Sequence, residues 1–244
     1  MFVLAIGALV WTAAVQRRRT GGVSALDNVR ANRAGWLGVA VLWIALDWPL
    51  GPLAAGYLLS VHALQFLLIA FVAAPLLVLG VSRAAPAISH VRGAWPFLAR
   101  ATRAPIVAAI VFNIVVVATH APSVVDSWMR SATGAFVIDA AWLAAGVLFW
   151  RPIIATSSGI RRLNTPLTML YLILGTLFHT VIAMIMLVRE FPMYAVFELA
   201  PPSFGISVMS DQQLAGGIME LGGAAIIVGY LTVLFFRWAA RDGL

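Results

Sequence analysis

Seven apolar runs, separated by short polar segments, constrain the fold of this sequence more than any other feature. A helix needs about 20 mostly apolar residues to cross a hydrocarbon core of about 30 Å. Each run approaches or exceeds that length, and the first, second and fourth are the shortest. The sequence therefore predicts an all-α bundle of about seven transmembrane helices. The runs cover about Phe2–Gln16, Gly35–Pro49, Gly56–Gly80, Pro105–Thr119, Ala132–Ile154, Leu167–Val188 and Leu214–Trp238.

The basic residues indicate how this bundle is oriented. All 16 are arginines, and only Arg130 and Arg189 lie in the segments after the fourth and sixth runs; the other 14 follow the odd-numbered runs. Positive charge is retained on the cytoplasmic side during insertion. We therefore expect the N-terminus outside and the C-terminus in the cytoplasm. The net charge of +7 then reflects topology and anionic membrane lipid, and it indicates no nucleic-acid partner.

Composition agrees with one polytopic membrane protein. With 62% hydrophobic and 10% charged residues in a chain of 244, residues 1–244 are expected to form a single integral membrane domain. The first run is followed by Arg17–Arg19, the reverse of a secretory signal, so we expect it to stay as a helix. Pro75 lies inside the third run and predicts a kink. Cysteine is absent, so soft-metal chemistry must use His and Met.

The longest outer segment, residues 189–213, combines prolines with aromatic residues. Such a mixture favours an interfacial cap lying over the bundle rather than a free linker. We expect this cap segment to shield whatever the outer face binds. The residues concerned are Pro192, Pro201, Pro202, Phe191, Tyr194, Phe197 and Phe204.

Three of the four histidines fall in the outer half of the predicted bundle. From the helical rise, His62 lies about 8 Å below the outer surface, His179 about 14 Å below it, and His120 at the outer end of the fourth helix. Met219 lies about five residues into the seventh run. Imidazole and thioether are the ligands expected for copper(I) where thiolates are absent. The pattern predicts one copper(I) site formed by His62, His120, His179 and Met219.

Other polar residues lie at similar depth. Gln65 follows His62 by one helical turn, and Asp139 and Glu220 each lie roughly 9 Å inside the outer surface. Ionisable groups inside a membrane are costly and are usually functional. Gln65 and Asp139 are therefore candidates to orient the imidazole rings, and Glu220 is a further candidate for cofactor binding. The alternative is that the two carboxyl groups pair with each other or with an imidazole.

Four stretches of the sequence resemble a known family. The resemblance extends in order over roughly residues 35–240, and its most specific parts are the Thr-His-x-Pro step and the Asp-Gln-Gln-Leu-Ala-Gly stretch. Together they look like the multi-spanning CtaG family of cytochrome c oxidase assembly proteins. The stretches are HALQFLLIAFVAAPLLVLG (62–80), THAPSVVD (119–126), LFWRP (148–152) and DQQLAGGIM (211–219).

The resemblance implies a protein of the bacterial plasma membrane that is needed to mature haem-copper oxidases. It further implies that the protein handles copper for the catalytic subunit, with oxidase subunits and a copper donor protein as partners. His62, His120, Asp211 and Met219 fall on patterned positions of the family, so Asp211 joins the candidate cofactor-binding residues.

Two positions depart from the family pattern. The family usually has a second histidine four residues after the first, where this chain has Phe66. It usually has an aromatic residue after the methionine, where this chain has Glu220. The first difference removes a possible ligand. The second supplies a candidate oxygen ligand or proton acceptor.

Three functions from different classes remain open. The leading hypothesis is an assembly factor that binds copper(I) in the outer half of the bundle and passes it to the oxidase. The second is a redox subunit that holds haem b between His62 and His179. The third is a metal-free integral scaffold of a respiratory complex. No motif for hydrolysis or phosphoryl transfer is present, so we expect no enzyme activity.

Overall fold

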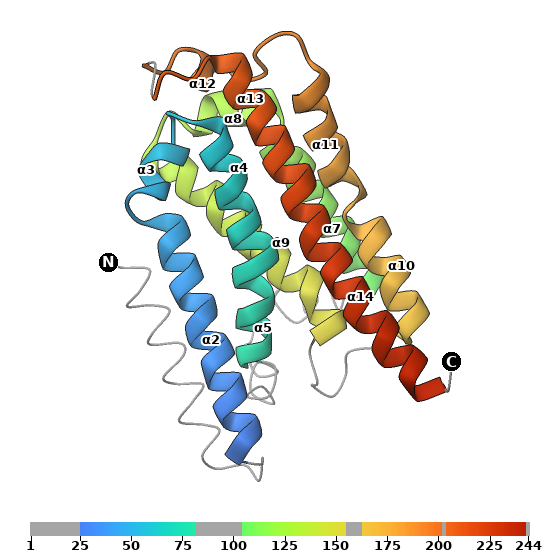
Figure 1. The fold of residues 1–244 in the computed structure, drawn as a ribbon. Helices are drawn as coiled ribbons and strands as arrows, with labels where there is room; N and C mark the ends of the chain where they lie inside the picture. The colour runs from blue at the N-terminus through green and yellow to red at the C-terminus, as the bar shows by residue number, and fades with distance from the viewer. Residues whose placement is uncertain (1–24, 82–103, 155–162, 202–203, 243–244) are drawn as a thin grey trace.

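The computed structural model describes residues 25–81, 104–154, 163–201 and 204–242, and these form a bundle of α-helices without strands (Figure 1). The predicted all-helical class is confirmed for this part of the chain. The first apolar run, at residues 2–16, lies outside the described residues. The larger helices are α2 (Ala25–Leu46), α4 (Leu59–Leu67), α5 (Ala74–Val81), α7 (Pro105–Thr119), α9 (Ala132–Ile154), α10 (Thr165–Gly175), α11 (Leu177–Val188), α13 (Val208–Gly217) and α14 (Gly223–Asp242).

Shorter elements complete the chain path. Two turns of π-helix, η1 and η3, link α4 to α5 and α13 to α14, so that each pair continues as one long helix. Three short helices lie at one end of the bundle, which we call the cap end (Figure 1). The short elements are α3 (Leu50–Ala54), η1 (Leu68–Ala73), α8 (Pro122–Trp128), α12 (Ala195–Glu198) and η3 (Ile218–Gly222).

Several of these helices are apolar and long enough to cross a membrane. Four meet the requirement by length and composition, and α7 with α8 makes a fifth if that pair, bent by 65°, is one span. Arg33–Leu46 is a shorter apolar helix. These helices confirm a membrane protein, whereas seven spans and the orientation of the termini stay predictions. The four are Leu59–Gly80, Ala132–Ile154, Thr165–Val188 and Val208–Arg241.

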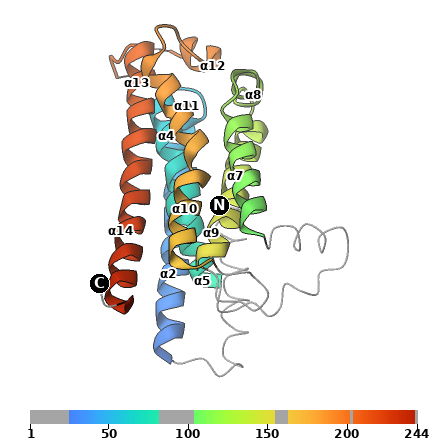
Figure 2. The ribbon, with the colours of Figure 1, turned by 90° about the vertical axis from the view of Figure 1, so that its right-hand side faces the viewer.

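The span formed by α4, η1 and α5 lies at the centre of the bundle. Within the described protein 67% of this span is buried, against 17% for Val208–Arg241. It packs against α2, α9 and α13, and the α13–α14 helix and α7 lie on opposite sides of it (Figure 2). Gly146 lets α9 approach closely, because a Cβ there would lie 2.9 Å from the carbonyl oxygen of Ala70. This central span carries His62.

The irregularity expected at Pro75 takes the form of the π-helical turn η1. The amide of Ala74 bonds to Ile69, five residues back, and Pro75 has no amide hydrogen. The carbonyl of Ala70 therefore accepts neither from the amide of Ala74, which bonds to Ile69, nor from Pro75. The indole Nε1 of Trp150 donates to it at 2.9 Å. A buried carbonyl must find such a partner in a membrane, so Trp150 both satisfies η1 and fixes α9 against it.

The two ends of the bundle differ in charge. Arg130 and Arg189 lie at the cap end, directly after α8 and α11. At the opposite end α2 begins and α14 terminates (Figure 1). Arg33 is near the start of α2, Arg151 near the end of α9, and Arg237 and Arg241 in the last turns of α14. The described arginines thus separate by end as the sequence pattern predicts.

Candidate metal site

The three histidines expected in the outer half lie near the cap end and are almost completely buried. His62 is in the first turn of α4, His120 is the residue that ends α7, and His179 is in the first turn of α11. Each side chain is 2% exposed. His179 is about nine residues from the end of α11 that lies at the cap end of the bundle. It therefore lies about 14 Å below that end of the helix. The three imidazoles come from helices far apart in the sequence and share one aromatic region.

His62 and His120 are neighbours. Their ring centroids are 6.5 Å apart, and the indole of Trp142 lies beside both, at 4.9 Å from His62 and 5.7 Å from His120. Trp142 is held in place because its Nε1 donates to the hydroxyl of Thr119 at 2.8 Å. The two imidazoles therefore lie against a fixed aromatic wall.

The hydrogen bonds of His120 determine which nitrogen carries its proton. Nδ1 lies 2.8 Å from the carbonyl oxygen of Val116. A carbonyl oxygen only accepts, so Nδ1 is the donor. In the neutral ring, Nε2 then has a free lone pair, and it has no hydrogen-bond partner. In a metal-ligating histidine, one ring nitrogen usually donates a hydrogen bond to the protein, and the other nitrogen is free to bind the metal ion.

His62 is the least satisfied polar side chain of the site. Neither Nδ1 nor Nε2 has a hydrogen-bond partner, although both atoms are buried. Its ring instead contacts Trp142 and Phe197, the latter at 5.7 Å. Buried polar atoms are nearly always hydrogen-bonded, because leaving one unpaired costs about 1–3 kcal/mol. Two unpaired nitrogens on one ring indicate that this side chain has a role other than packing.

His179 also packs against Phe66. The fully buried Phe66 ring is 5.0 Å from His120 and 5.7 Å from His179. The Nε2 of His179 is buried and has no hydrogen-bond partner. Gly223 makes room for this ring, because a Cβ there would lie 2.3 Å from Cε1 of His179. The phenyl ring thus contacts both His120 and His179, whereas no ring contact among the described residues joins His179 to His62 or His120.

The structure does not gather the four predicted ligands around one point. Across residues 25–81, 104–154, 163–201 and 204–242, no group of three His, Asp or Glu side chains could hold one metal ion. Met219 is fully buried. What the structure brings together is the pair His62 and His120. One site shared by all four residues stays a prediction.

The remaining candidates differ in their hydrogen bonding. The Nε2 amide of Gln65 donates to Ala45 in α2 at 3.0 Å, so its donor is used away from the rings. Asp139 is partly buried, and no hydrogen bond joins it to another described residue. Glu220 lies in the π-helical turn η3, and its Oε2 is buried without a partner. A role of these groups in binding stays a prediction.

Asp211 stabilises the start of the helix that carries His62. Its Oδ2 accepts from the amide of Leu59 at 2.6 Å and its Oδ1 from the amide of Ser60 at 3.2 Å. The hydroxyl of Ser60 also donates to it. These are the amides that a helix leaves unpaired at its N-terminus, and a carboxylate there also complements the helix dipole. Asp211 thus caps α4 from another helix.

The segment after α11 covers the histidines from the cap end. Phe197 of α12 lies on His62, and the hydroxyl of Tyr194 donates to the carbonyl of His120 at 2.8 Å. Burial raises the pKa of Tyr194, so this hydroxyl keeps its proton. Asp126 accepts from the amide of Val196 at 2.9 Å and fixes α12 to α8. The cap segment therefore closes the site.

Trp142 and Thr119 belong to the site although the sequence did not single them out for it. Thr119 precedes His120 in the Thr-His-x-Pro step and receives the indole bond of Trp142. Trp142 occurs within a uniformly apolar run, where periodicity alone does not distinguish a packing residue from a wall of a site. The sequence feature that could have identified Trp142 is its indole N–H inside a membrane helix, because this donor needs a hydrogen-bond partner there.

These observations define a polytopic membrane protein with buried imidazoles under an aromatic cap. A sequence model of the cytochrome c oxidase caa3 assembly factor (Caa3_CtaG) family matches residues 7–241, so the chain belongs to this family. The resemblance noted from the motifs is thereby confirmed over nearly the whole chain. Neither curated proteins nor solved structures provide a match to it.

Proposed function

We propose that this protein assists the assembly of a haem-copper cytochrome c oxidase by binding copper(I) transiently at His62 and His120 and releasing it to an oxidase subunit. Family membership supports oxidase assembly. The observation that supports copper is the pair of neighbouring imidazoles with three unpartnered ring nitrogens. The ion is cargo, loaded by a donor protein and collected by the client. The compartment is the bacterial plasma membrane.

The separation of the two rings suits an ion between them. A metal-bound imidazole nitrogen lies about 2 Å from its ion, so two imidazoles on opposite sides of one ion have centroids roughly 6 Å apart. The observed 6.5 Å requires only a small adjustment. Neutral imidazoles are suitable donors for copper(I), which tolerates two ligands. His179 and Met219 could join this ion only if the ring of Phe66 moved.

The surroundings of the pair support transient binding. Trp142, Phe66 and Phe197 exclude water, and Val116 orients His120. Within the part of the chain that the structure describes, no carboxylate forms a hydrogen bond with the imidazole of His62 or of His120. A site with few ligands holds an ion weakly enough to release it. Its position beside the cap segment is accessible from outside the membrane once α12 moves.

The haem alternative fits the same residues less well. A haem bound by His62 and His179 needs a flat space between them, and the fully buried Phe66 is one turn after His62 and 5.7 Å from His179. The position of Phe66 therefore favours copper over haem as the bound group. The metal-free scaffold remains the second candidate function, because the pair His62 and His120 is packed against aromatic rings even without an ion.

Metal content and optical spectrum of one sample purified in mild detergent test the proposal. We expect copper without a haem Soret band. His62→Ala and His120→Ala should each remove most of the copper and lower oxidase maturation, and His179→Ala should remove less. Thr168→Ala, a buried polar residue of α10, is the matched control. Full copper in all three histidine variants would show that the metal assignment is wrong. A Soret band would identify haem instead, and full maturation without any metal would identify a scaffold.

A further inference from the structure

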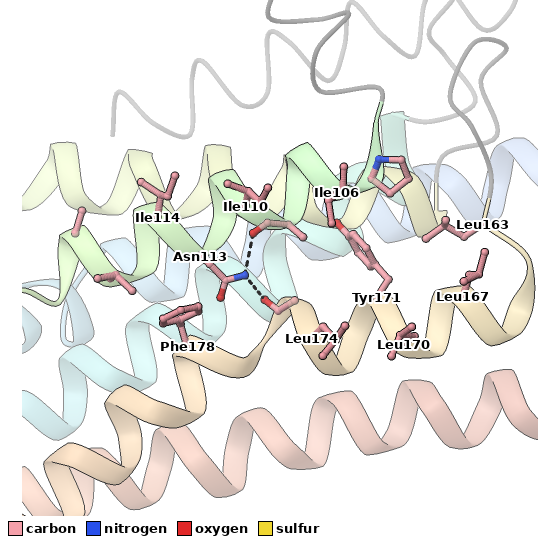
Figure 3. Close-up of a pocket in the computed structure, with 15 residues that line it drawn as sticks. Ile106, Ile110, Asn113, Ile114, Leu163, Leu167, Leu170, Tyr171, Leu174 and Phe178 are labelled. Atoms are coloured by element: carbon pink, nitrogen blue, oxygen red, sulfur yellow. Dashed lines mark hydrogen bonds between the residues drawn. The ribbon is translucent and has the colours of Figure 1, made fainter.

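A second feature of the molecule is an apolar groove on the surface of the bundle. It has a volume of about 760 Å³ and lies between α7 and the α10–α11 pair (Figure 3). Ile106, Ile110 and Ile114 form one wall, and Leu167, Leu174 and Phe178 form the other. These side chains are between 49% and 67% exposed. None of the three histidines is among the residues that line the groove, and the groove has no part in the proposed handling of copper.

Two polar side chains, Asn113 and Tyr171, line this groove. The hydroxyl of Tyr171 donates to the carbonyl of Phe149 at 2.8 Å, so Asn113 is the one to consider. Its Nδ2 donates to the carbonyl of Ala109 at 2.8 Å and to that of Gly175 at 2.9 Å. The helix is interrupted at Thr176, between α10 and α11. Gly175, whose carbonyl accepts from Asn113, is the last residue of α10 before this interruption. Turning the amide over would place its oxygen against two carbonyl oxygens, so the orientation of Asn113 is fixed.

The fixed orientation leaves an unpaired acceptor in the groove. Oδ1 of Asn113 is buried and has no hydrogen-bond partner. In Figure 3 this oxygen points towards Phe178, whose ring is 49% exposed and is free to turn aside. An unpaired amide oxygen in an apolar environment costs free energy, so an occupant that donates a hydrogen bond here is favoured over one that only fills space.

The depth of Asn113 decides which occupant can donate. It is near the middle of the 15-residue helix α7, about 12 Å from the first residue. Water and lipid headgroups do not reach that depth in a bilayer, and an acyl chain has no donor. A transmembrane helix can offer a hydroxyl, amide or indole donor, and such polar contacts between membrane helices are favourable by about 0.6–2 kcal/mol.

We propose that the α7–α10 groove docks a transmembrane helix of another membrane protein, and that a donor side chain near the middle of that helix bonds to Oδ1 of Asn113. The apolar walls match the apolar surface of such a helix. The unpaired Oδ1 of Asn113 sets the register of that helix, because a donor at only one position along the helix can bond to it. This docking surface is independent of metal binding and operates within the membrane.

Photo-crosslinking in native membranes tests this surface. A photoreactive amino acid replaces Ile110 or Leu174 in the full chain, and Val228 on the exposed side of α14 (57% exposed) is the reference position. We expect an adduct with a different membrane protein from the groove positions only. The crosslinked peptide should lie in a transmembrane segment, within one turn of a donor side chain. Replacing that donor with an apolar residue should lower the adduct yield by about three- to tenfold.

Two variants of this chain complete the test. Asn113→Leu removes the acceptor, but it also removes the bond to Gly175. Ile114→Trp fills the groove and leaves Asn113 intact, and Val228→Trp is its matched control. Ile114→Trp should abolish the adduct and Asn113→Leu should lower its yield by about three- to tenfold, while the control retains it. Adducts with lipid alone, with a second copy of this chain, or with no molecule would overturn the proposal. An adduct that is unaffected by loss of the donor or by Ile114→Trp would overturn it as well.

Discussion

At the scale of single residues, Phe66 is the position at which the proposed copper site can be tested most directly. Its phenyl ring is 5.0 Å from His120 and 5.7 Å from His179, and it is fully buried. The family pattern that the motifs resemble usually has a histidine at this position.

Phe66→His should therefore tighten copper binding. The new imidazole would lie next to His120 and would add a third nitrogen to the pair, which we expect to raise the affinity for copper(I) by about tenfold or more, or about 1.4 kcal/mol. Competition with a copper(I) chelator measures this affinity. Phe66→Leu is the control for loss of the ring alone. An affinity of Phe66→His no higher than that of Phe66→Leu would contradict a site centred on these residues.

Gly223 is the residue on which the position of His179 depends most directly. A Cβ at Gly223 would lie 2.3 Å from Cε1 and 3.0 Å from Nε2 of His179. Gly223→Ala should force the imidazole to move and destabilise the protein by about 1–3 kcal/mol, the usual cost of overpacking. Thermal unfolding in detergent measures the change. Gly217→Ala is a matched control, since nothing lies within 4 Å of its Cβ. Equal unfolding temperatures of the two variants would show that His179 has room to adjust.

At the scale of elements, the helix that carries His62 begins where Asp211 caps it. Asp211→Ala removes the acceptor for the amides of Leu59 and Ser60, and we expect a loss of about 2–3 kcal/mol, since bonds to a charged acceptor are stronger than average. Unfolding in denaturant measures this loss. Gln213→Ala, on the exposed face of the same helix, should change stability little. If folded Asp211→Ala protein has lost its copper while its stability is unchanged, Asp211 is a ligand rather than a cap.

The cap segment is the second element that governs the site. Phe197 covers His62 at 5.7 Å, so Phe197→Ala should expose this imidazole without removing any hydrogen bond. We expect faster modification of His62 by an imidazole-specific acylating reagent, measured peptide by peptide with mass spectrometry. Leu199→Ala in the same segment, where the side chain is already 80% exposed, is the control. An unchanged rate at His62 would mean that other residues close the site.

The bounds of some helices are predicted correctly from the sequence. The runs Pro105–Thr119 and Ala132–Ile154 coincide with α7 and α9, because apolar length and flanking breakers determine where such helices start and end. The break at Thr176 inside the sixth run has no proline or charge to mark it. The carbonyl of Gly175, just before this break, accepts from Asn113, a contact between residues remote in sequence.

The candidate site was predictable in depth but not in detail. Helical rise places His62, His120 and His179 near one end, and the structure agrees. Which rings face one another depends on how each helix is rotated, and the sequence holds no record of that rotation. The same limit applies to Asp211, whose partners Leu59 and Ser60 are more than 150 residues earlier. Its pairing with a helix start is a tertiary contact that no local pattern reveals.

At the scale of the whole molecule, the separation of charge between the two ends predicts the orientation in the membrane. The end where α2 begins and α14 terminates carries Arg33, Arg237 and Arg241. The cap end has Arg130 and Arg189 together with Glu190 and Glu198. Arginine excess marks the cytoplasmic side, so we expect the cap end outside, where a copper donor and the oxidase site that receives copper would meet it.

Single cysteines placed in this natively cysteine-free chain report that orientation. Glu198→Cys and Arg241→Cys are exposed positions at opposite ends. A membrane-impermeant thiol reagent should label position 198 in intact cells and position 241 only after the membrane is opened. The cysteine-free parent controls for background, and labelling of both variants in opened membranes controls for accessibility. Labelling of position 241 but not 198 in intact cells would reverse the topology. It would also place the histidine pair on the cytoplasmic side, where copper would have to be supplied from within the cell.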